Sequence, residues 1–165
     1  TRDGVIWVTA SKSGLYRYER GRWTKITASG AFDGGDAYLA FTDREGTLWL
    51  SDGKRLLRMP AGQDRFVDSG VAAGWAFQMR QSPDGTLWIS EHQGGVRPVW
   101  RRGPISPSSA PGFDIESAGV QFGRDGDLWI ASLGDGLFRV QRPAYAPGTG
   151  PAAPERFAKA DGLSS

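Results

Sequence analysis

The sequence predicts an all-β fold made of four consecutive repeats, each a small antiparallel sheet of four strands. A string of the form acid-Gly-x-apolar-Trp-aliphatic occurs four times, at spacings of about 40 residues. Short apolar runs bounded by Gly, Asp, Ser or Pro flank each copy, a pattern typical of strands. The 165 residues also include 24 Gly and 10 Pro, which disfavours a helical bundle.

Each repeat predicts its strands in the same order. The first strand is an apolar run at 38–41, 75–79 or 120–122, and the second carries the Trp of the string. A third strand follows at 14–17, 55–58, 95–97 and 136–139, and a shorter fourth piece is visible at 23–26, 65–67 and 156–158. We expect fifteen of the sixteen strands of four repeats, because the chain starts at the second strand of the first one.

Several of these strands are apolar at consecutive positions, as in Leu48-Trp49-Leu50, which indicates burial on both faces. Four strands per repeat, with neighbouring sheets on both sides, are typical of a β-propeller blade. We place the blades at 1–37 (partial), 38–74, 75–117 and 118–165. Four blades form an open arc rather than a closed ring, so we expect part of a larger propeller with apolar faces that seek a partner.

The repeated Trp and Gly residues have structural interpretations. We expect the four Trp side chains to pack between blades rather than to stack on a ligand. The Gly of each acid-Gly pair is expected to supply the positive φ of a hairpin turn. These residues are Trp7, Trp49, Trp88 and Trp129, with Gly4, Gly46, Gly85 and Gly126.

The composition excludes several classes of chemistry. There is no Cys, which removes disulfides, thiolate metal sites and Cys nucleophiles, and the single His92 rules out a site of several histidines. The acid-Gly-acid string at Asp125 has too few oxygen ligands for an EF-hand calcium loop. A net charge of +2 is a weak signature of nucleic-acid binding. We therefore expect no metal, no cofactor and no nucleic-acid partner.

The repeat strings resemble the two-component regulator propeller repeat. The best copies are 83–90 with 94–96, and 124–140, and the stretch 157–165 is similar to the family's blade-to-blade linker. Two departures stand out: Lys54-Arg55 replaces the usual Gly-Gly, and a Pro/Ala/Gly-rich insertion runs from Pro143 to Pro154.

The resemblance implies a ligand-sensing region on the periplasmic or extracellular side of a membrane-anchored bacterial protein. Such regions precede a histidine kinase, a hybrid kinase–response regulator or a diguanylate cyclase, and are themselves non-catalytic. Family propellers usually have seven blades, which implies that further blades of the same chain, or a second copy, complete this one. A homodimer is expected in the intact sensor. The chain begins at Thr1 rather than Met and shows neither a signal peptide nor a membrane span, which leaves an upstream leader or anchor open.

The default binding surface is the face that carries the loops between strands two and three and the loops between blades. The inter-blade loops are expected at 28–36, 68–74, 109–116 and 161–165. The residues that we select as ligand-binding candidates are Asp52, Lys54, Trp75, Glu91, His92, Gln93, Phe113 and Asp135. Their ligand would be an unknown small molecule or a carbohydrate.

For some of these residues a structural role is the alternative. His92 could be an exposed loop residue without a role, and core packing is favoured for Trp75. A basic and aromatic cluster surrounds Trp100, with Arg97 expected on the third strand and Arg101 and Arg102 on the following turn, on the opposite face; a solvated turn explains it better than a nucleic-acid site.

The sequence thus favours a non-enzymatic sensor module. A propeller enzyme, either a lyase or a sugar hydrolase, is the first alternative, and it would need acids or a His facing the centre of a closed ring. A protein-interaction scaffold is the second alternative. It differs from the sensor only in its partner.

Overall fold

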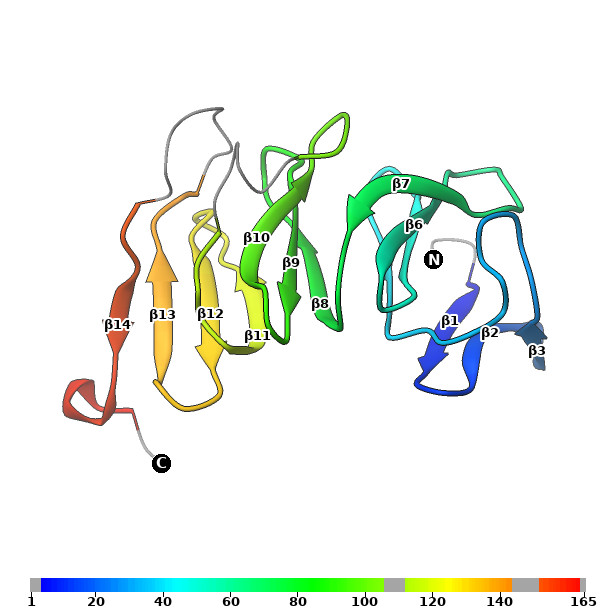
Figure 1. Ribbon diagram of the computed structural model, residues 1–165. Coiled ribbons are helices and arrows are strands. Elements are labelled where there is room, and N and C mark those ends of the chain that lie inside the picture. Colours follow the sequence, from blue (N-terminus) through cyan, green and yellow to red (C-terminus); the bar gives the residue numbers. More distant parts are fainter. Residues whose placement is uncertain (1–3, 106–111, 144–151, 164–165) are drawn as a thin grey trace. The chain divides into compact units, whose positions relative to one another are not determined.

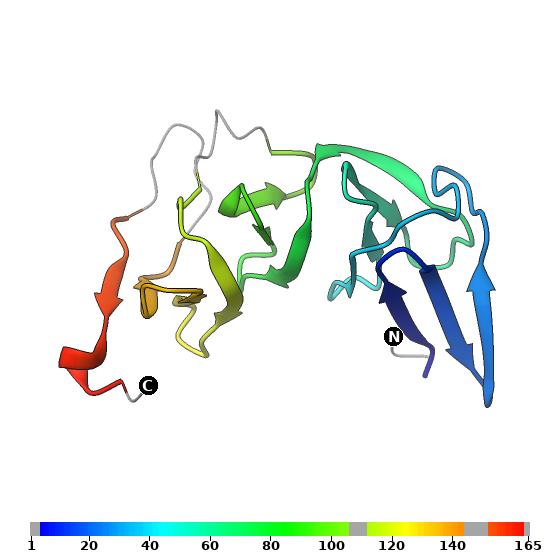
Figure 2. The same ribbon diagram turned by 60° about the horizontal axis from the view of Figure 1, so that its bottom comes forward.

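A computed structural model describes residues 4–105, 112–143 and 152–163 of the chain (Figure 1). Within these residues there are fourteen strands in four antiparallel sheets, a single short 3-10 helix, η1 (Lys159–Asp161), and no α-helix. The predicted all-β fold of small antiparallel sheets is therefore confirmed. The strand order in each sheet can be followed by colour in Figure 1 and again in Figure 2.

The chain divides into two compact units, residues 1–76 and 77–165, and each unit holds two sheets. In unit 1 the strands of the first sheet are β1 (Ile6–Ala10), β2 (Gly14–Glu19) and β3 (Arg22–Ile26). Those of the second are β4 (Leu39–Thr42), β5 (Leu48–Ser51), β6 (Arg55–Met59) and β7 (Val67–Ala72). Strands that follow one another in sequence are paired, so each sheet is a meander, as expected of a blade.

Unit 2 repeats this arrangement. Its first sheet comprises β8 (Ala76–Gln81), whose first residue still belongs to unit 1, β9 (Leu87–Glu91) and β10 (Gly95–Trp100). Its second sheet comprises β11 (Ser117–Phe122), β12 (Leu128–Ser132), β13 (Leu137–Val140) and β14 (Glu155–Phe157). We refer to the four sheets in chain order as blades 1 to 4.

The described residues of blade 3 contain no fourth strand, one fewer than the sequence predicted. Phe113 takes that place with a single bridge to Val96, formed by two backbone hydrogen bonds of 2.9 and 2.7 Å. The preceding residues 106–111, within the predicted loop 109–116, lie outside the described part of the chain.

The prediction of a loop at 68–74 is wrong for most of that range, because β7 extends through Ala72. Only Ser69 and Val71 of this strand are buried, and a register shift between Leu56 and Leu57 of the partner strand interrupts the pairing. A strand with so few apolar residues leaves no apolar run in the sequence. The sequence pattern therefore predicts the end of this strand too early.

The acid-Gly pairs form closely similar turns in blades 2, 3 and 4. Gly46, Gly85 and Gly126 have φ values of 86°, 90° and 89°, in the left-handed region that glycine tolerates best. In each turn the glycine N–H donates to the carbonyl three residues earlier, at 3.0–3.1 Å. The turn then delivers the chain into the Trp-bearing second strand.

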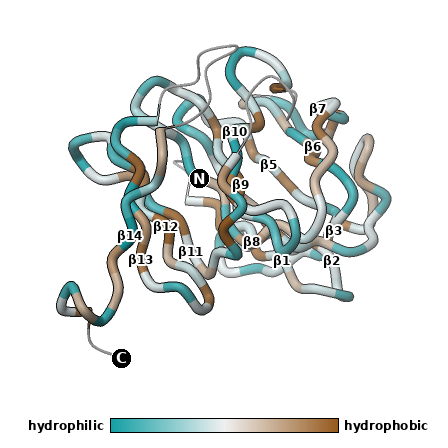
Figure 3. The backbone as a smooth tube through the Cα atoms, turned by 60° about the vertical axis from the view of Figure 1, so that its left-hand side comes forward, coloured by the Kyte–Doolittle hydropathy of each residue, from teal (hydrophilic) through white to brown (hydrophobic). Residues whose placement is uncertain are grey.

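Each unit has its own hydrophobic core between its two sheets. In unit 1 the core residues are Leu15, Phe32, Ala37, Leu48, Leu50, Leu57 and Phe66. In unit 2 they are Trp88, Val96, Phe113, Val120, Leu128, Ile130 and Val140. Figure 3 shows hydrophobic colour along strands such as β9 and β12. Burying one such side chain contributes about 1.5–3 kcal/mol.

The four repeated Trp side chains are buried to different degrees. Trp49 and Trp88 are 1% and 2% exposed, whereas Trp7 and Trp129 are half-buried. Trp7 packs against the core of unit 1. The described residues include no helix with the length and hydrophobicity needed to cross a membrane.

Candidate functional site

The candidate residues fall into one group in each unit. Asp52, Lys54 and Trp75 belong to unit 1, and Glu91, His92, Gln93, Phe113 and Asp135 belong to unit 2.

Asp52 closes the turn between β5 and β6. Its Oδ1 accepts the backbone N–H groups of Lys54 and Arg55 at 2.9 and 3.0 Å, and its Oδ2 lies 3.3 Å from Arg55 Nε. The same guanidinium reaches Asp68 Oδ2 at 2.6 Å. Asp52 therefore has a structural role in this turn, while the neighbouring Lys54 is exposed.

Arg55 and its two carboxylate partners, Asp52 and Asp68, stabilise one another's charged forms. The backbone N–H of Gly70 donates to Asp68 Oδ1 at 2.8 Å and, together with the Arg55 guanidinium and against partial desolvation, lowers the pKa of Asp68. The two carboxylates, Asp68 first and Asp52 second, raise the pKa of Arg55. Both charged forms are thus favoured in the folded state.

Trp75 is not a core residue: its side chain is 56% exposed. The indole stacks on the ring of Tyr38, with the centroids 6.1 Å apart and the planes inclined by 20°. The Tyr38 hydroxyl donates to Asp36 Oδ2 at 3.2 Å. Partial desolvation and this neighbouring carboxylate raise the pKa of Tyr38. We call Tyr38, Trp75 and Asp36 the aromatic platform.

The platform is fixed to the turn between β5 and β6. The Tyr38 N–H donates to the Ser51 carbonyl at 2.9 Å, and Ser51 Oγ lies 3.3 Å from the Gly74 carbonyl. Gly53 lies under the Tyr38 ring, where a Cβ would come within 2.7 Å of a ring carbon. Neither Tyr38 nor Asp36 was predicted from the sequence to be a site residue. Tyr38 is the first residue of the apolar run at 38–41.

Glu91 lies at the end of β9 in a buried ion pair. Its Oε2 is 2.7 Å from Arg97 Nε, and the two side chains are 7% and 11% exposed. A Cβ at Gly94 would come within 2.8 Å of the same oxygen, so the loop closes over the carboxylate. Glu91 therefore does not present its charge to solvent, and Arg97 lies on β10, the third strand on which it was predicted.

His92 is a half-buried residue at the centre of a surface patch in unit 2. Its Nδ1 lies 3.6 Å from Glu116 Oε1, and its ring meets Phe77 edge-on with the centroids 5.9 Å apart. Phe77 and Leu133 are 46% and 59% exposed, and the Leu133 N–H donates to the Glu116 carbonyl. This surface patch, defined as Phe77 on β8 with the loop residues His92, Glu116 and Leu133, thus combines apolar surface with one His–Glu pair.

The other candidates of unit 2 are more dispersed. Gln93 is exposed in the turn after His92. The Asp135 side chain is 71% exposed, and its Oδ1 lies 3.4 Å from Arg156 Nη2. Phe113 is only 6% exposed and stacks on Trp88 with an interplanar angle of 13°. Its predicted place in an exposed loop is wrong, because the bridge to Val96 draws it into the core. Among the described residues, no three His, Asp or Glu side chains are grouped so that they could hold a metal ion.

Comparison with solved structures agrees with the sheet topology. The chain is similar to the extracellular domains of two hybrid two-component systems of B. thetaiotaomicron, BT3049 and BT4673. The TM-scores are 0.60 and 0.64, and the sequence identities are 18% and 13%. It is also similar to virginiamycin B lyase from Staphylococcus aureus, with a TM-score of 0.63 and 20% identity. The fold is a β-propeller fold.

These similarities at low identity establish the propeller fold alone. They cover 88%, 93% and 84% of this chain, but only 19%, 21% and 49% of the BT3049, BT4673 and lyase chains. The chain thus spans about a fifth of the two-component propellers and about half of the lyase. No protein-family model matches the sequence, and no curated protein matches it.

Proposed function

We propose that this chain is a ligand-sensing β-propeller module of a bacterial two-component-type sensor, non-catalytic in itself. The observation that carries the proposal is the aromatic platform, in which an exposed Trp75 stacks on the half-buried Tyr38 and a carboxylate lies at the Tyr38 hydroxyl. The similarity to extracellular domains of two hybrid two-component systems supports the same proposal. It also supports a place on the periplasmic or extracellular side of a membrane-anchored protein.

The chemistry of the platform favours a carbohydrate. The exposed Trp75 ring offers a flat apolar surface on which the C–H face of a pyranose can rest. The Asp36 carboxylate, which accepts the Tyr38 hydroxyl, is a charged acceptor for sugar hydroxyls as well, and charge-assisted hydrogen bonds are stronger than neutral ones. Lys54, exposed on the adjoining turn, adds hydrogen-bond donors.

The chain offers a matched control for this site. Trp23, on β3, is 55% exposed against 56% for Trp75, and its ring lies 4.8 Å from that of Tyr18, tilted by 44°. We expect Trp75→Ala to abolish calorimetric binding of a neutral oligosaccharide found by screening cellohexaose, maltohexaose and xylohexaose. Trp23→Ala should leave that affinity unchanged. Equal losses in both variants, or no binding of any of the three, would contradict the carbohydrate assignment.

Signalling requires the ligand to bind one arrangement of the sensor more tightly than another. A ligand with equal affinity for both does not shift the equilibrium between them. In the intact protein we propose that further blades, or a second copy, complete the propeller and that the sensor is a homodimer. The coding sequence around this segment tests the assignment: an apolar span followed by a kinase or cyclase supports it. A flanking hydrolase domain without such a span would contradict it.

An enzyme remains the second candidate, because of the His92–Glu116 pair. An imidazole 3.6 Å from a carboxylate, beside exposed apolar side chains, brings together two groups that general acid–base catalysis uses. A streptogramin B lyase and a gluconolactonase-type protein are among the similar structures. Turnover of virginiamycin B or of gluconolactone by the chain, lost in His92→Ala and retained in Gln93→Ala, would establish catalysis and overturn the non-catalytic assignment.

A further inference from the structure

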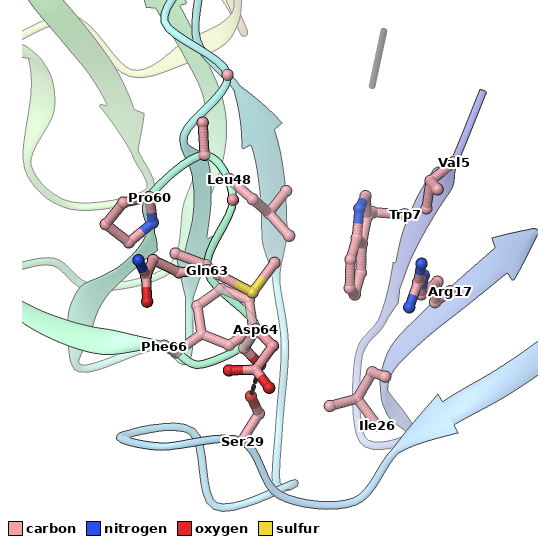
Figure 4. Close-up of a pocket in the computed structure, with 14 residues that line it drawn as sticks. Val5, Trp7, Arg17, Ile26, Ser29, Leu48, Pro60, Gln63, Asp64 and Phe66 are labelled. Atoms are coloured by element: carbon pink, nitrogen blue, oxygen red, sulfur yellow. Dashed lines mark hydrogen bonds between the residues drawn. The ribbon is translucent and has the colours of Figure 1, made fainter. Parts of the chain in front are cut away.

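Unit 1 contains a cleft between blades 1 and 2, and no residue of the aromatic platform lines it. The volume of the cleft is about 400 Å³, within the range typical of small-molecule sites. Figure 4 shows its two walls. Trp7 and Ile26 come from blade 1, and Leu48, Met59 and Phe66 come from blade 2. Most of the side chains that face each other across the cleft are thus apolar.

The loop that follows β6 forms one rim of the cleft, and hydrogen bonds hold it in place. The Gln63 N–H donates to the Pro60 carbonyl at 3.0 Å, which closes a turn. Ser29 Oγ donates to the Asp64 carbonyl at 2.9 Å, and the Phe66 N–H donates to the Ser29 carbonyl at 3.3 Å. These bonds join the loop to the segment that follows β3, so the backbone of Asp64 has a fixed position at the rim.

The Asp64 side chain is exposed and lines the cleft. Among the residues that the structure describes, no cationic side chain lies within ion-pair distance of its carboxylate. Figure 4 shows Asp64 and Ser29 together at one end of the cleft. Because Ser29 Oγ donates its hydrogen to the Asp64 carbonyl, its lone pairs can accept a hydrogen bond from elsewhere. This end of the cleft therefore offers two acceptors to a ligand with N–H donors.

The charge on the opposite wall is already balanced. The charged side chains among the described lining residues are Arg17, from blade 1, and Asp64, from blade 2. Arg17 Nη2 lies 2.8 Å from Glu19 Oε2, and its guanidinium lies over the Trp7 ring, 5.8 Å from the centroid. The unbalanced charge of the cleft is therefore that of the Asp64 carboxylate, which favours a cationic ligand over an anionic one.

Unit 2 shows which kind of group suits the tryptophan on the cleft wall. Trp88, the corresponding residue of blade 3, meets the ring of Phe122 edge-on with the centroids 6.3 Å apart, and it is 2% exposed. Phe122 and Thr42 have the same place in blades 4 and 2, each at the end of the first strand and opposite the residue that precedes the repeated Trp. Thr42 offers no ring, and Trp7 is half-buried. An aromatic ligand would give Trp7 the type of partner that Trp88 has within the chain.

We propose that the cleft of unit 1 binds a small aromatic monoamine. The ammonium group donates to the Asp64 carboxylate and to Ser29 Oγ, and the aromatic body packs against Trp7, Leu48 and Met59. A carboxylate in the place of the ammonium group would meet the charge of Asp64, so anionic analogues bind more weakly. This inference is independent of the sensing role and of the aromatic platform.

NMR titration of the ¹⁵N-labelled full chain with tryptamine, tryptophol and indole-3-acetate tests the site. The three ligands share an indole ring and carry a cationic, a neutral and an anionic group. We expect tryptamine to bind about threefold more tightly than tryptophol, the gain typical of an exposed ion pair, and indole-3-acetate to bind most weakly. Saturating shifts should occur at the indole N–H of Trp7 and at the amides of Ala61 and Asp64, but not at the indole of Trp23. Equal affinities for the three ligands, or no saturable shift at Trp7, would overturn the proposal.

A pair of matched variants tests the role of the carboxylate. Asp64→Asn keeps the shape of the side chain but removes its charge, and it should make the affinities for tryptamine and tryptophol nearly equal. Asp33→Asn removes an exposed carboxylate of unit 1 that does not line the cleft, and it should preserve the preference for tryptamine. A folded Asp64→Asn chain that keeps the wild-type preference would show that the ammonium group does not bind at Asp64.

Discussion

The carboxylate of Asp43 accepts the indole N–H of Trp49 at 2.8 Å. Its other oxygen accepts the backbone N–H of Thr47 at 2.7 Å, so one side chain closes the turn before β5 and satisfies a tryptophan that is 1% exposed. In blade 3 the corresponding residue is Ser82, and Trp88 Nε1 has no hydrogen-bond partner among the described residues. The repeated tryptophan thus has a side-chain hydrogen-bond acceptor in blade 2, whereas its counterpart in blade 3 has none among the described residues.

This difference predicts how much stability is lost when the acceptor of Trp49 is removed. Asp43→Ala should lower the free energy of unfolding by about 1–3 kcal/mol, because it leaves a buried indole N–H without its acceptor. Urea denaturation followed by tryptophan fluorescence measures the effect. Asp64→Ala, which removes an exposed carboxylate from the same unit, should stay within about 0.5 kcal/mol. Equal effects of the two substitutions would show that the bond to Trp49 does not stabilise the fold.

The buried pair of Glu91 and Arg97 predicts a larger penalty. Glu91→Ala should cost about 3–5 kcal/mol, because it removes the carboxylate that is paired with the buried charge of Arg97. Asp135→Ala breaks the exposed contact with Arg156 in the same unit and should cost no more than about 1 kcal/mol. Thermal unfolding of the two variants distinguishes them. A loss of stability in Glu91→Ala as small as that in Asp135→Ala would mean that the Arg97 charge readily reaches solvent.

Gly95 marks the position where blade 3 is least tolerant of a side chain. It has a φ of 64°, and an added Cβ would lie 2.1 Å from the Phe113 carbonyl oxygen, at the bridge that replaces the fourth strand. Gly85 also has a positive φ, but nothing lies within 4 Å of its added Cβ. Gly85→Ala should therefore cost only the backbone strain, about 1–2 kcal/mol. Gly95→Ala should cost clearly more in the same denaturation experiment, and similar values would exclude a close approach of Phe113.

The repeat in the sequence was enough to predict the fold, because it places a tryptophan, a turn and a third strand at constant spacing. Prediction from the repeat failed where strand pairing, rather than composition, decides whether a side chain is buried. Phe113 was assigned to a loop although one bridge to Val96 buries it, and Trp75 was favoured for the core although it is exposed. The aromatic platform could not be predicted because Tyr38 and Trp75 lie far apart in sequence.

The lowered pKa of Asp68 predicts how stability depends on pH. Because its folded pKa lies below the unfolded value of about 3.9, this carboxylate contributes stability above that pH, and the contribution is lost as the pH falls through the folded pKa. Asp68→Asn should therefore reduce the fall in the urea midpoint between about pH 5 and pH 2. An acid-induced fall as steep in Asp68→Asn as in wild type would assign the pH dependence to other carboxylates.

The most direct test of sensing through the aromatic platform is an NMR titration of the ¹⁵N-labelled full chain with the oligosaccharide that binds. We predict that the largest shifts occur at the indole N–H of Trp75 and at the backbone amides of Tyr38 and Gly53, with no change at the indole of Trp23. Saturating shifts confined to residues away from Tyr38 and Trp75 would contradict the assignment of this platform as the sensing site.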